Sequence, residues 1–366
     1  DDAPRGVAPT DRYSLGRPLH LGVAPGTWPA PLDVPLPLRS RNNALLDGAL
    51  AGLRPTLRSV LEGIAPTRIG VVIGSSTSGI AEGEAAMAAL VRDGAMPAAF
   101  HYGQQDLYSA ARFVAARIGA QGPAVTVSTA CSSGAKALAS AARWLKAGFC
   151  DAVIAGGADS LCAFTVAGFR ALESVSADRC NPSSRNRCGI NIGEGAALFV
   201  LTREPGAIRL SGWGESSDAH HISAPEPQGK GAEAAMRQAL QRAGLEPGAI
   251  DYINLHGTAT PLNDLAESLA VQRIFGDGPW CSSTKPLTGH ALGAAGAIEA
   301  AFCWMLLQGN ASGVLPPHWW DGAVDPTLAQ LRLVEPGTRL GRAPRHLLSN
   351  SFAFGGNNAS LILSAE

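Results

Sequence analysis

The 366-residue sequence is poor in lysine, in charge and in long apolar runs. Only four of its 29 basic residues are Lys (Lys136, Lys146, Lys230 and Lys285), so a Lys inside a motif stands out. Charged residues make up 16% and the formal net charge is −1, which leaves no basic excess for binding nucleic acid. No stretch reaches the roughly 20 apolar residues of a membrane span, and no secretory signal is recognisable. We therefore expect a cytoplasmic protein without a membrane span.

Cysteine is scarce and irregularly spaced. The seven Cys are an odd number in a long chain, which argues against a disulfide framework and for reduced thiols. Cys180 and Cys188 are separated by seven residues, which is not a usual zinc spacing, so we predict no metal site. Apolar residues are not scarce: they make up 46% of the chain, enough to build a substantial core.

Short apolar runs alternate with helical patterns along most of the chain. The runs at 69–74 and 152–155 are typical of buried strands, and the spacing at 135–147 predicts an amphipathic helix. Strands that are apolar on both faces predict an α/β protein whose sheets are covered by helices. The two halves, residues 1–203 and 204–366, have a similar order of elements, which is consistent with a weak structural duplication.

Cys131 lies between a predicted strand and a predicted helix, in a loop of small residues. A thiol at a helix N-terminus feels the positive end of the helix dipole and free backbone N–H groups, and both favour the reactive thiolate. We therefore expect Cys131 to be a nucleophile. The alternative is a buried structural cysteine.

Three further segments place reactive side chains on loops that end elements. His256 follows a predicted strand, where α/β folds bind ligands, although a loop His that holds a turn is an alternative. Lys285 stands five residues before His290, ahead of an apolar helix; the alternative is an ordinary surface lysine. Residues 350–358 place two Phe beside a double Gly, which an ordinary tight turn also explains. One thiol and two imidazoles together suit acyl transfer with an enolate step.

The four segments resemble, in order and spacing, those of β-ketoacyl-[acyl-carrier-protein] synthases. The matching stretches are VSTACSSGAKAL, HGTATPLND, STKPLTGHALGAAGAIEA and NSFAFGGNNASL, and the resemblance covers roughly residues 65–366. It implies a thiolase-like α/β fold with αβαβα layers, built of two similar halves. Residues 1–203 would carry the nucleophilic Cys, and residues 204–366 the two catalytic His.

The resemblance also implies roles for individual residues. Cys131 would be the acylated nucleophile, while His256 and His290 would bind the malonyl thioester carbonyl and promote decarboxylation. The backbone N–H groups of Cys131 and Phe354 would form the oxyanion hole, and Phe354 would also gate the acyl pocket.

The same resemblance predicts a supporting set around these groups. Lys285 would orient or charge-balance the site, with Glu299 as its buried partner. The remaining implied roles are loop support for Asp264 and Glu267 and substrate binding for Thr258, Thr260 and Phe352. We also expect Ile80 to bind substrate, as part of the lining of the acyl tunnel. Because carrier proteins are typically acidic, we expect clustered arginines to dock the carrier protein, namely Arg170, Arg179, Arg185 and Arg187.

Residues 39–43 and 215–225, with Ala353 and Asn357, most resemble the ketosynthases of bacterial aryl polyene clusters. This resemblance implies decarboxylative Claisen condensation of malonyl-carrier-protein with an acyl group on Cys131. The substrates would be carried on the phosphopantetheine of an acyl carrier protein, without a metal or organic cofactor. The expected partners are that carrier protein and a second subunit, in a homodimer or in a heterodimer with a chain-length-factor-like chain.

Other functions stay open at this point. One alternative is a fatty acid elongation ketosynthase of primary metabolism. A second is a non-catalytic chain-length-factor partner, although such partners usually lack the Cys. A third is a thiolase that works on coenzyme A esters, although that branch typically uses one His and a second Cys.

Overall fold

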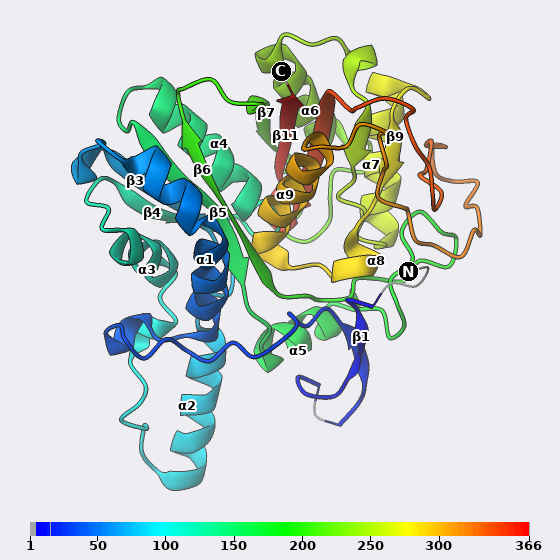
Figure 1. The fold of residues 1–366 in the computed structure, drawn as a ribbon. Coiled ribbons are helices and arrows are strands. Elements are labelled where there is room, and N and C mark those ends of the chain that lie inside the picture. Colours follow the sequence, from blue (N-terminus) through cyan, green and yellow to red (C-terminus); the bar gives the residue numbers. More distant parts are fainter. Residues whose placement is uncertain (1–4, 15, 366) are drawn as a thin grey trace.

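The computed structural model describes residues 5–14 and 16–365 and arranges them around two mixed β-sheets (Figure 1). The extreme ends of the two predicted halves, residues 1–4 and 366, lie outside the described residues. The first sheet has the strand order β4-β3-β5-β6, with β3 (Ile69–Gly74), β4 (Ala124–Val127), β5 (Ala152–Asp159) and β6 (Gly195–Thr202). The second has the order β7-β11-β10-β8-β9, with β7 (Ile208–Ser217), β8 (Tyr252–Asn254), β9 (Trp280–Ser282), β10 (His346–Ala353) and β11 (Asn357–Ala365).

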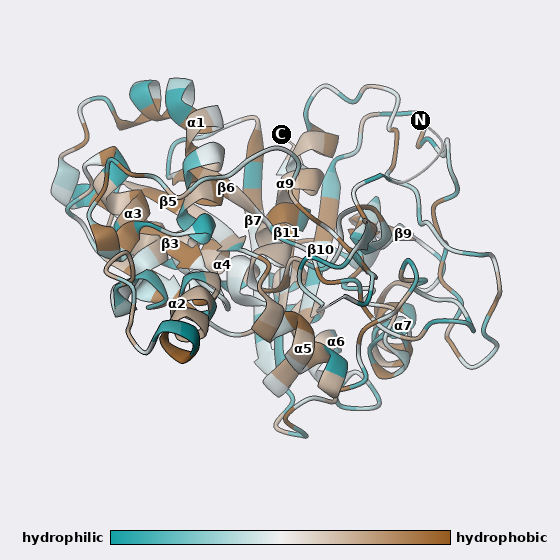
Figure 2. Ribbon diagram, turned by 90° about the horizontal axis from the view of Figure 1, so that it is seen from below, coloured by the Kyte–Doolittle hydropathy of each residue, from teal (hydrophilic) through white to brown (hydrophobic). Residues whose placement is uncertain are grey.

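Helices lie between the sheets and on both outer faces, which produces five αβαβα layers. The inner layer consists of α4 (Ser133–Lys146) and α9 (Ala295–Leu307), which share one apolar core with both sheets. The outer pairs are α1 (Arg41–Leu61) with α3 (Tyr108–Ile118), and α6 (Lys230–Ala243) with α7 (Pro261–Phe275). Hydrophobic colouring is strong on the inner helix α9 in Figure 2, whereas the outer helix α6 carries more hydrophilic residues.

The two sheets repeat one topology. In the first, β3 pairs in parallel with β4 and β5, and β5 pairs antiparallel with β6. In the second, β8 pairs in parallel with β9 and β10, and β10 pairs antiparallel with β11. The inner helices occupy corresponding places, because α4 connects β4 to β5 and α9 lies between β9 and β10. The predicted thiolase-like fold of two similar halves is confirmed.

Several smaller elements were not anticipated from the pattern. They are the helix α5 (Ala163–Ala171), the strand β9 and the one-turn helix α8 (Lys285–Thr288). Two short strands near the N-terminus, β1 (Ala8–Thr10) and β2 (Leu19–Leu21), pair with each other. The helix α2 (Ile80–Asp93) extends away from the layered body in Figure 1. Within the described ranges, no helix combines the length and the apolar content needed to cross a membrane.

The two inner helices approach closely because small residues face one another. A Cβ atom added at Gly134 would lie 2.8 Å from the backbone N of Ala297, and one at Gly296 would lie 2.9 Å from the backbone N of Ala135. Real Cβ atoms essentially never come closer than about 3 Å to such atoms, so neither position has room for a side chain. Glycine at both positions therefore brings the N-terminal ends of α4 and α9 together.

We predict that Gly134→Ala lowers the free energy of unfolding by about 1–3 kcal/mol, because the added methyl group must push α4 away from α9. Chemical denaturation of the purified protein measures this change. Gly52→Ala is the matched control: Gly52 is exposed on α1 and has no described atom near its Cβ position. That change should instead stabilise by about 0.4–1 kcal/mol. Equal stability of the Gly134→Ala variant and the parent would contradict the close-packing argument.

Candidate active site

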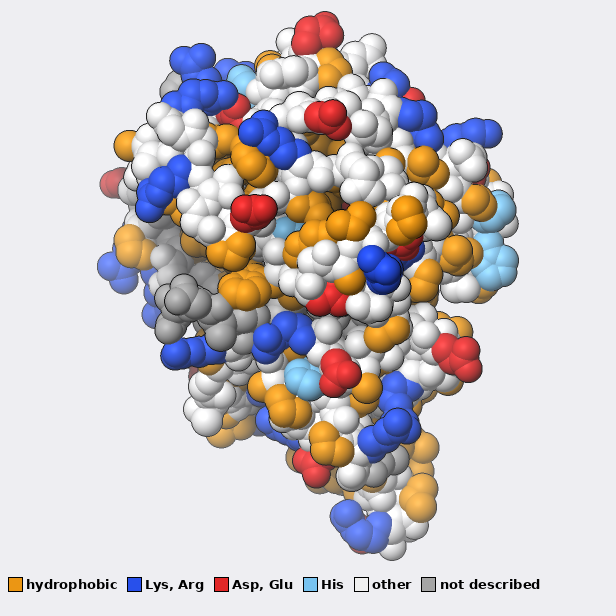
Figure 3. All heavy atoms as spheres, turned by 90° about the vertical axis from the view of Figure 1, so that its right-hand side faces the viewer, with side chains coloured by type: hydrophobic (Ala, Val, Ile, Leu, Met, Phe, Trp, Pro, Cys, Tyr) orange, Lys and Arg blue, Asp and Glu red, His pale blue; other side chains and the backbone are white. Residues whose placement is uncertain are grey.

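Cys131, His256 and His290 converge on one cavity of about 330 Å³. Cys131 follows β4, His256 follows β8, and His290 lies between α8 and α9. One sulfur or ring nitrogen from each residue lies within 4.8 Å of the other two. Each of the three side chains is almost fully buried. Hydrophobic side chains gather near the centre of the face shown in Figure 3, with basic and acidic side chains dispersed around them.

A strained turn presents the thiol. Ala130, immediately before the nucleophile, has a φ of 50°, a left-handed conformation that non-glycine residues rarely adopt. The Ser133 hydroxyl holds this turn: it accepts from the backbone N–H of Thr129 at 2.9 Å and donates to the Ala130 carbonyl at 2.6 Å. The chain therefore reverses sharply at Cys131, and α4 begins two residues later, at Ser133.

Burial keeps this thiol protonated, so the expectation that its position favours thiolate is wrong for the free site. Loss of solvation raises the pKa of Cys131 to about 12, even though the Lys285 charge and the backbone N–H groups of Phe354 and Cys131 act in the opposite direction. The backbone N–H groups do favour the thiolate, but the cost of desolvation outweighs them. A base must take the proton when the sulfur attacks.

The two imidazoles are neutral and available to a substrate. Their ring centroids lie 5.3 Å apart, with the planes nearly perpendicular. Burial and the nearby Lys285 charge hold the pKa of both His256 and His290 well below the ordinary value. Nδ1 of His256 and both ring nitrogens of His290 have no hydrogen-bond partner among the described residues. A buried polar atom without a partner is costly, so these nitrogens are suited to hydrogen bonds with a bound substrate.

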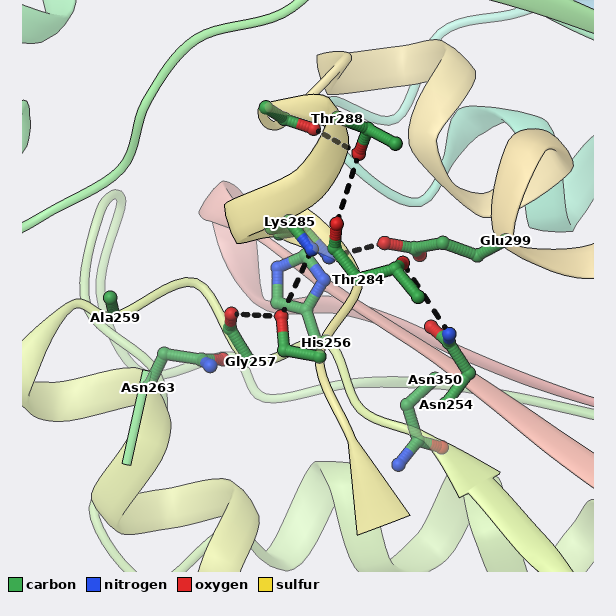
Figure 4. Close-up of polar contacts among 12 residues, drawn as sticks. Asn254, His256, Gly257, Ala259, Asn263, Thr284, Lys285, Thr288, Glu299 and Asn350 are labelled. Atoms are coloured by element: carbon green, nitrogen blue, oxygen red, sulfur yellow. Dashed lines mark hydrogen bonds and ion pairs between the residues drawn. The ribbon is translucent and has the colours of Figure 1, made fainter. Parts of the chain in front are cut away.

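Lys285 and Glu299 form a buried ion pair behind the imidazoles. The Lys285 ammonium lies 2.5 Å from a Glu299 carboxylate oxygen, and the two side chains are 2% and 4% exposed. Figure 4 shows Lys285 beside the His256 ring, with a dashed line from Lys285 to Glu299. Burial raises the pKa of Glu299, and the Lys285 charge opposes that rise. Lys285 therefore supplies positive charge to the site while Glu299 compensates for its burial.

Two carboxylates from α7 hold the loop that carries His256. Glu267 accepts hydrogen bonds from the backbone N–H groups of His256 and Gly257, each at 2.8 Å. Asp264 accepts from the backbone N–H of Ala259, which has a φ of 62°. Both carboxyl groups are buried, and burial raises the pKa of Glu267 to about 7. These contacts fix where the His256 ring enters the cavity.

The predicted substrate-binding threonines and Phe residues also line the cavity. The hydroxyl oxygens of Thr258 and Thr260 lie 2.9 Å apart. The Phe352 ring packs 6.0 Å from His256, and the Phe354 ring lies 5.8 Å from Phe169 on α5. Phe354 begins a loop, residues 354–356, that connects β10 to β11. Phe354 therefore has two roles: its side chain forms part of the cavity wall, and its backbone N–H interacts with the Cys131 sulfur.

Other predicted residues lie farther out. Ile80 is half-buried at the start of α2 and is not among the described residues that line the cavity, so its role in the acyl tunnel stays a prediction. Arg170 and Arg185 are exposed, as a docking role requires. Arg179 is partly buried and donates to the Val7 carbonyl at 3.0 Å.

Arg187 is a correction to the predicted docking set. Its guanidinium lies 2.5 Å from the Asp325 carboxylate and also donates to the Ser184 carbonyl, and its side chain is only 8% exposed. A side chain buried in an ion pair is not available to an acidic partner. Arg187 instead ties the loop 180–189 to the segment that contains Asp325.

Asp159 is a structural residue of the site that the sequence analysis missed. It ends β5 and is fully buried. Its carboxylate accepts from the backbone N–H groups of Ser76 and Thr77, and from Gly293 at 2.6 Å. It therefore ties the end of β3 to the turn just after His290. An acidic residue at the end of an apolar strand was the available signal.

The three reactive groups also have the spacing of a metal site. Sulfur and imidazole ligands suit zinc. The Lys285 charge, however, acts on all three groups and opposes a divalent cation among them. The expectation that no metal takes part stays a prediction.

Comparison with known proteins identifies relatives of the whole fold. A model of the β-ketoacyl synthase N-terminal domain matches residues 51–207, and one of the β-ketoacyl synthase C-terminal domain matches residues 208–319. The mitochondrial 3-oxoacyl-[acyl-carrier-protein] synthase of Arabidopsis thaliana is 38% identical over 273 residues, which cover 69% of this chain and 58% of that protein. Nodulation protein E of Rhizobium meliloti (strain 1021) is 37% identical over 307 residues, which cover 80% of this chain and 75% of that protein.

A solved structure gives the same result over more of the chain. It is a ketosynthase, ApeO, in complex with its chain length factor, ApeC, from Xenorhabdus doucetiae. The TM-score is 0.92 at 43% identity, and the match covers 99% of this chain and 90% of that one. With two domain models in series, curated relatives above 30% identity and this structural match, the chain belongs to the β-ketoacyl synthase family.

Proposed function

We propose that the protein is a β-ketoacyl-[acyl-carrier-protein] synthase, an acyltransferase that extends an acyl chain by decarboxylative condensation. One observation carries this proposal: the Cys131 sulfur and one ring nitrogen from each of two buried imidazoles lie within 4.8 Å of one another, and all three residues line one cavity. This is the arrangement needed to hold a thioester carbonyl beside an acylated thiol. The name of the Arabidopsis relative supports the carrier-bound substrate.

The first half-reaction loads Cys131. Its sulfur attacks the thioester carbonyl of an acyl carrier protein, and the tetrahedral oxyanion accepts hydrogen bonds from the backbone N–H groups of Cys131 and Phe354. Because the thiol is protonated in the free site, its proton passes to a neutral imidazole as the S–C bond forms. The pantetheine thiol leaves and takes up that proton. The acyl group is then held as a thioester on Cys131.

The second half-reaction forms the carbon–carbon bond. The malonyl thioester carbonyl accepts hydrogen bonds from His256 and His290, the bond to its carboxylate breaks, and CO₂ leaves. The two imidazoles stabilise the resulting enolate, which attacks the acyl carbon on Cys131. The C–S bond to Cys131 breaks, the sulfur leaves as a thiolate that takes up a proton from water, and the product stays on the carrier protein. No metal or organic cofactor is needed for these steps.

The proposed pathway is aryl polyene biosynthesis, supported by the resemblance of residues 39–43 and 215–225 to that subgroup. Fatty acid elongation is the competing function, supported by the 3-oxoacyl-[acyl-carrier-protein] synthase among the relatives. Polyenoyl and aryl carrier substrates, compared with saturated ones of equal length, separate the two. Faster turnover of the saturated chains would favour fatty acid elongation.

The proposed partner is a chain-length-factor-like subunit, supported by the complex of ApeO with ApeC. The proposed compartment is the cytoplasm, supported by seven cysteines that all carry free thiols. A homodimer is the alternative assembly.

Replacing the nucleophile tests the reaction. Cys131→Ala should abolish acyl loading, because the new side chain has no nucleophilic atom, and it should leave malonyl decarboxylation measurable, because both imidazoles remain. Intact-protein mass after incubation with acyl carrier protein measures loading, and CO₂ release measures decarboxylation. Cys188→Ser is the matched control, since Cys188 is a second free thiol that lines the same cavity. Chain elongation by Cys131→Ala would overturn the proposal.

The protonation state of the imidazoles predicts the pH dependence of decarboxylation. A pKa lowered well below 6.5 means that His256 and His290 stay neutral as the pH falls through that value. Decarboxylation by Cys131→Ala should therefore change less than about twofold between about pH 8 and about pH 6, whereas an imidazole of ordinary pKa would lose about three quarters of its neutral form. A rate that falls in step with ordinary imidazole titration would contradict neutral buried imidazoles.

The partner proposal predicts a defined assembly. Coexpression with the neighbouring genes of its own cluster, followed by native mass measurement, should give a complex with one copy of this chain and one of a related chain. A mass of two identical chains in the presence of that related chain would contradict the heterodimer.

A further inference from the structure

A hydrogen bond between Lys136 and Asn357 links two parts of the site. The proposed reaction gives neither residue a role. Lys136 lies on α4, five residues after Cys131. Its ammonium group donates a hydrogen bond of 3.0 Å to the side-chain oxygen of Asn357. Asn357 is the first residue of β11 and directly follows the loop 354–356. The link thus joins the helix of the nucleophile to the exit of the loop that carries Phe354.

The acceptor in this link is an uncharged amide, although an acidic residue lies nearby. Glu215 acts electrostatically on Lys136, but its carboxylate is paired with Arg143 on the same helix. Lys136 is half-buried, and burial lowers its pKa. A partly desolvated ammonium gains most from a well-placed acceptor, and Asn357 provides it.

Two glycines give the loop a left-handed backbone that other residues rarely adopt. Gly355 and Gly356 have φ angles of 80° and 71°. The loop is held from one side by the segment 218–222: Gly355 N–H donates to the Ile222 carbonyl at 2.8 Å, and Asp218 N–H donates to the Gly356 carbonyl at 2.9 Å. Both contacts come from the C-terminal half. The Lys136–Asn357 bond comes from α4, in the N-terminal half.

We propose that Lys136 and Asn357 are positioning residues that keep the loop 354–356 in register with α4. The distance that matters is between the Phe354 N–H and the Cys131 sulfur, and the link fixes the loop on the helix that carries that sulfur. A hydrogen bond to an amide holds this register and still breaks when the loop moves. The proposal rests on the proposed function, since it concerns the oxyanion donor of that reaction.

The test compares six variants of the chain, purified with any subunit that accompanies it. They are Lys136→Met, Asn357→Leu, the double variant of these two, Asn357→Asp alone and combined with Lys136→Met, and Lys146→Met as a control. Lys146 is an exposed lysine at the end of the same helix. Rapid-quench measurement of Cys131 acylation over a range of acyl-carrier concentrations gives the maximal rate and the half-saturating concentration. Thermal unfolding checks that each variant is folded.

Lys136→Met and Asn357→Leu each remove the hydrogen bond that holds the loop of Phe354, the oxyanion donor. Each should therefore lower the maximal acylation rate about tenfold. The half-saturating concentration should change less than about twofold, because carrier binding is not involved. The double variant should be no slower than either single variant. Asn357→Asp keeps the acceptor oxygen, so its maximal acylation rate should stay close to that of the parent when Lys136 is present. In the Lys136→Met background, Asn357→Asp should not restore the lost rate.

Three outcomes would overturn the proposal: acylation at the parent rate in Lys136→Met, multiplicative losses in the double variant, or an Asn357→Asp variant as slow as Asn357→Leu. Each leaves the proposed function intact if the parent and Lys146→Met still acylate Cys131. Failure of the parent and of Lys146→Met to acylate would instead count against the proposed function.

Discussion

The contact between α4 and α9 is the constraint on which the site depends. Cys131 lies just before α4, and His290 lies shortly before α9. The helices meet through Gly134 and Gly296, where no side chain fits. Because the helices belong to different halves of the fold, their close approach brings a thiol from one half to an imidazole from the other. The duplicated topology therefore has a chemical consequence: neither half contains a complete site.

Burial then determines the charges in the site. The cavity walls exclude enough water to keep the thiol protonated and both imidazoles neutral. The Lys285–Glu299 pair introduces one positive charge into this environment and compensates for it with one carboxylate. Breaking such a buried pair costs about 3–5 kcal/mol in typical proteins, so the pair is a fixed part of the architecture. The neutral groups around it are those whose protonation changes during the reaction.

Much of this could be predicted from the sequence, because the reacting residues lie in short motifs at strand ends. The loops after β8 and β10 carry His256 and Phe354, and these parallel neighbours bring their ends to one edge of the second sheet. Cys131 follows β4 in the first sheet, and the contact between α4 and α9 brings it to the same place. Long-range partners could not be predicted. Arg187 looked like a docking residue because its partner, Asp325, is 138 positions away. The helix position of Cys131 predicted a thiolate, but desolvation depends on packing that no local pattern shows.

Under the proposed function, a dry site that takes a carrier-bound substrate must satisfy two opposed requirements. Its hydrogen-bond donors must be rigid to stabilise an oxyanion, yet the wall of the cavity must open for a pantetheine arm. Phe354 serves both requirements, since its N–H acts on Cys131 while its ring forms part of the wall. Glycines at positive φ shape the loop, and hydrogen bonds from both halves hold it. Each of these tethers is a hydrogen bond rather than a buried ion pair, so each costs less to break than the Lys285–Glu299 pair.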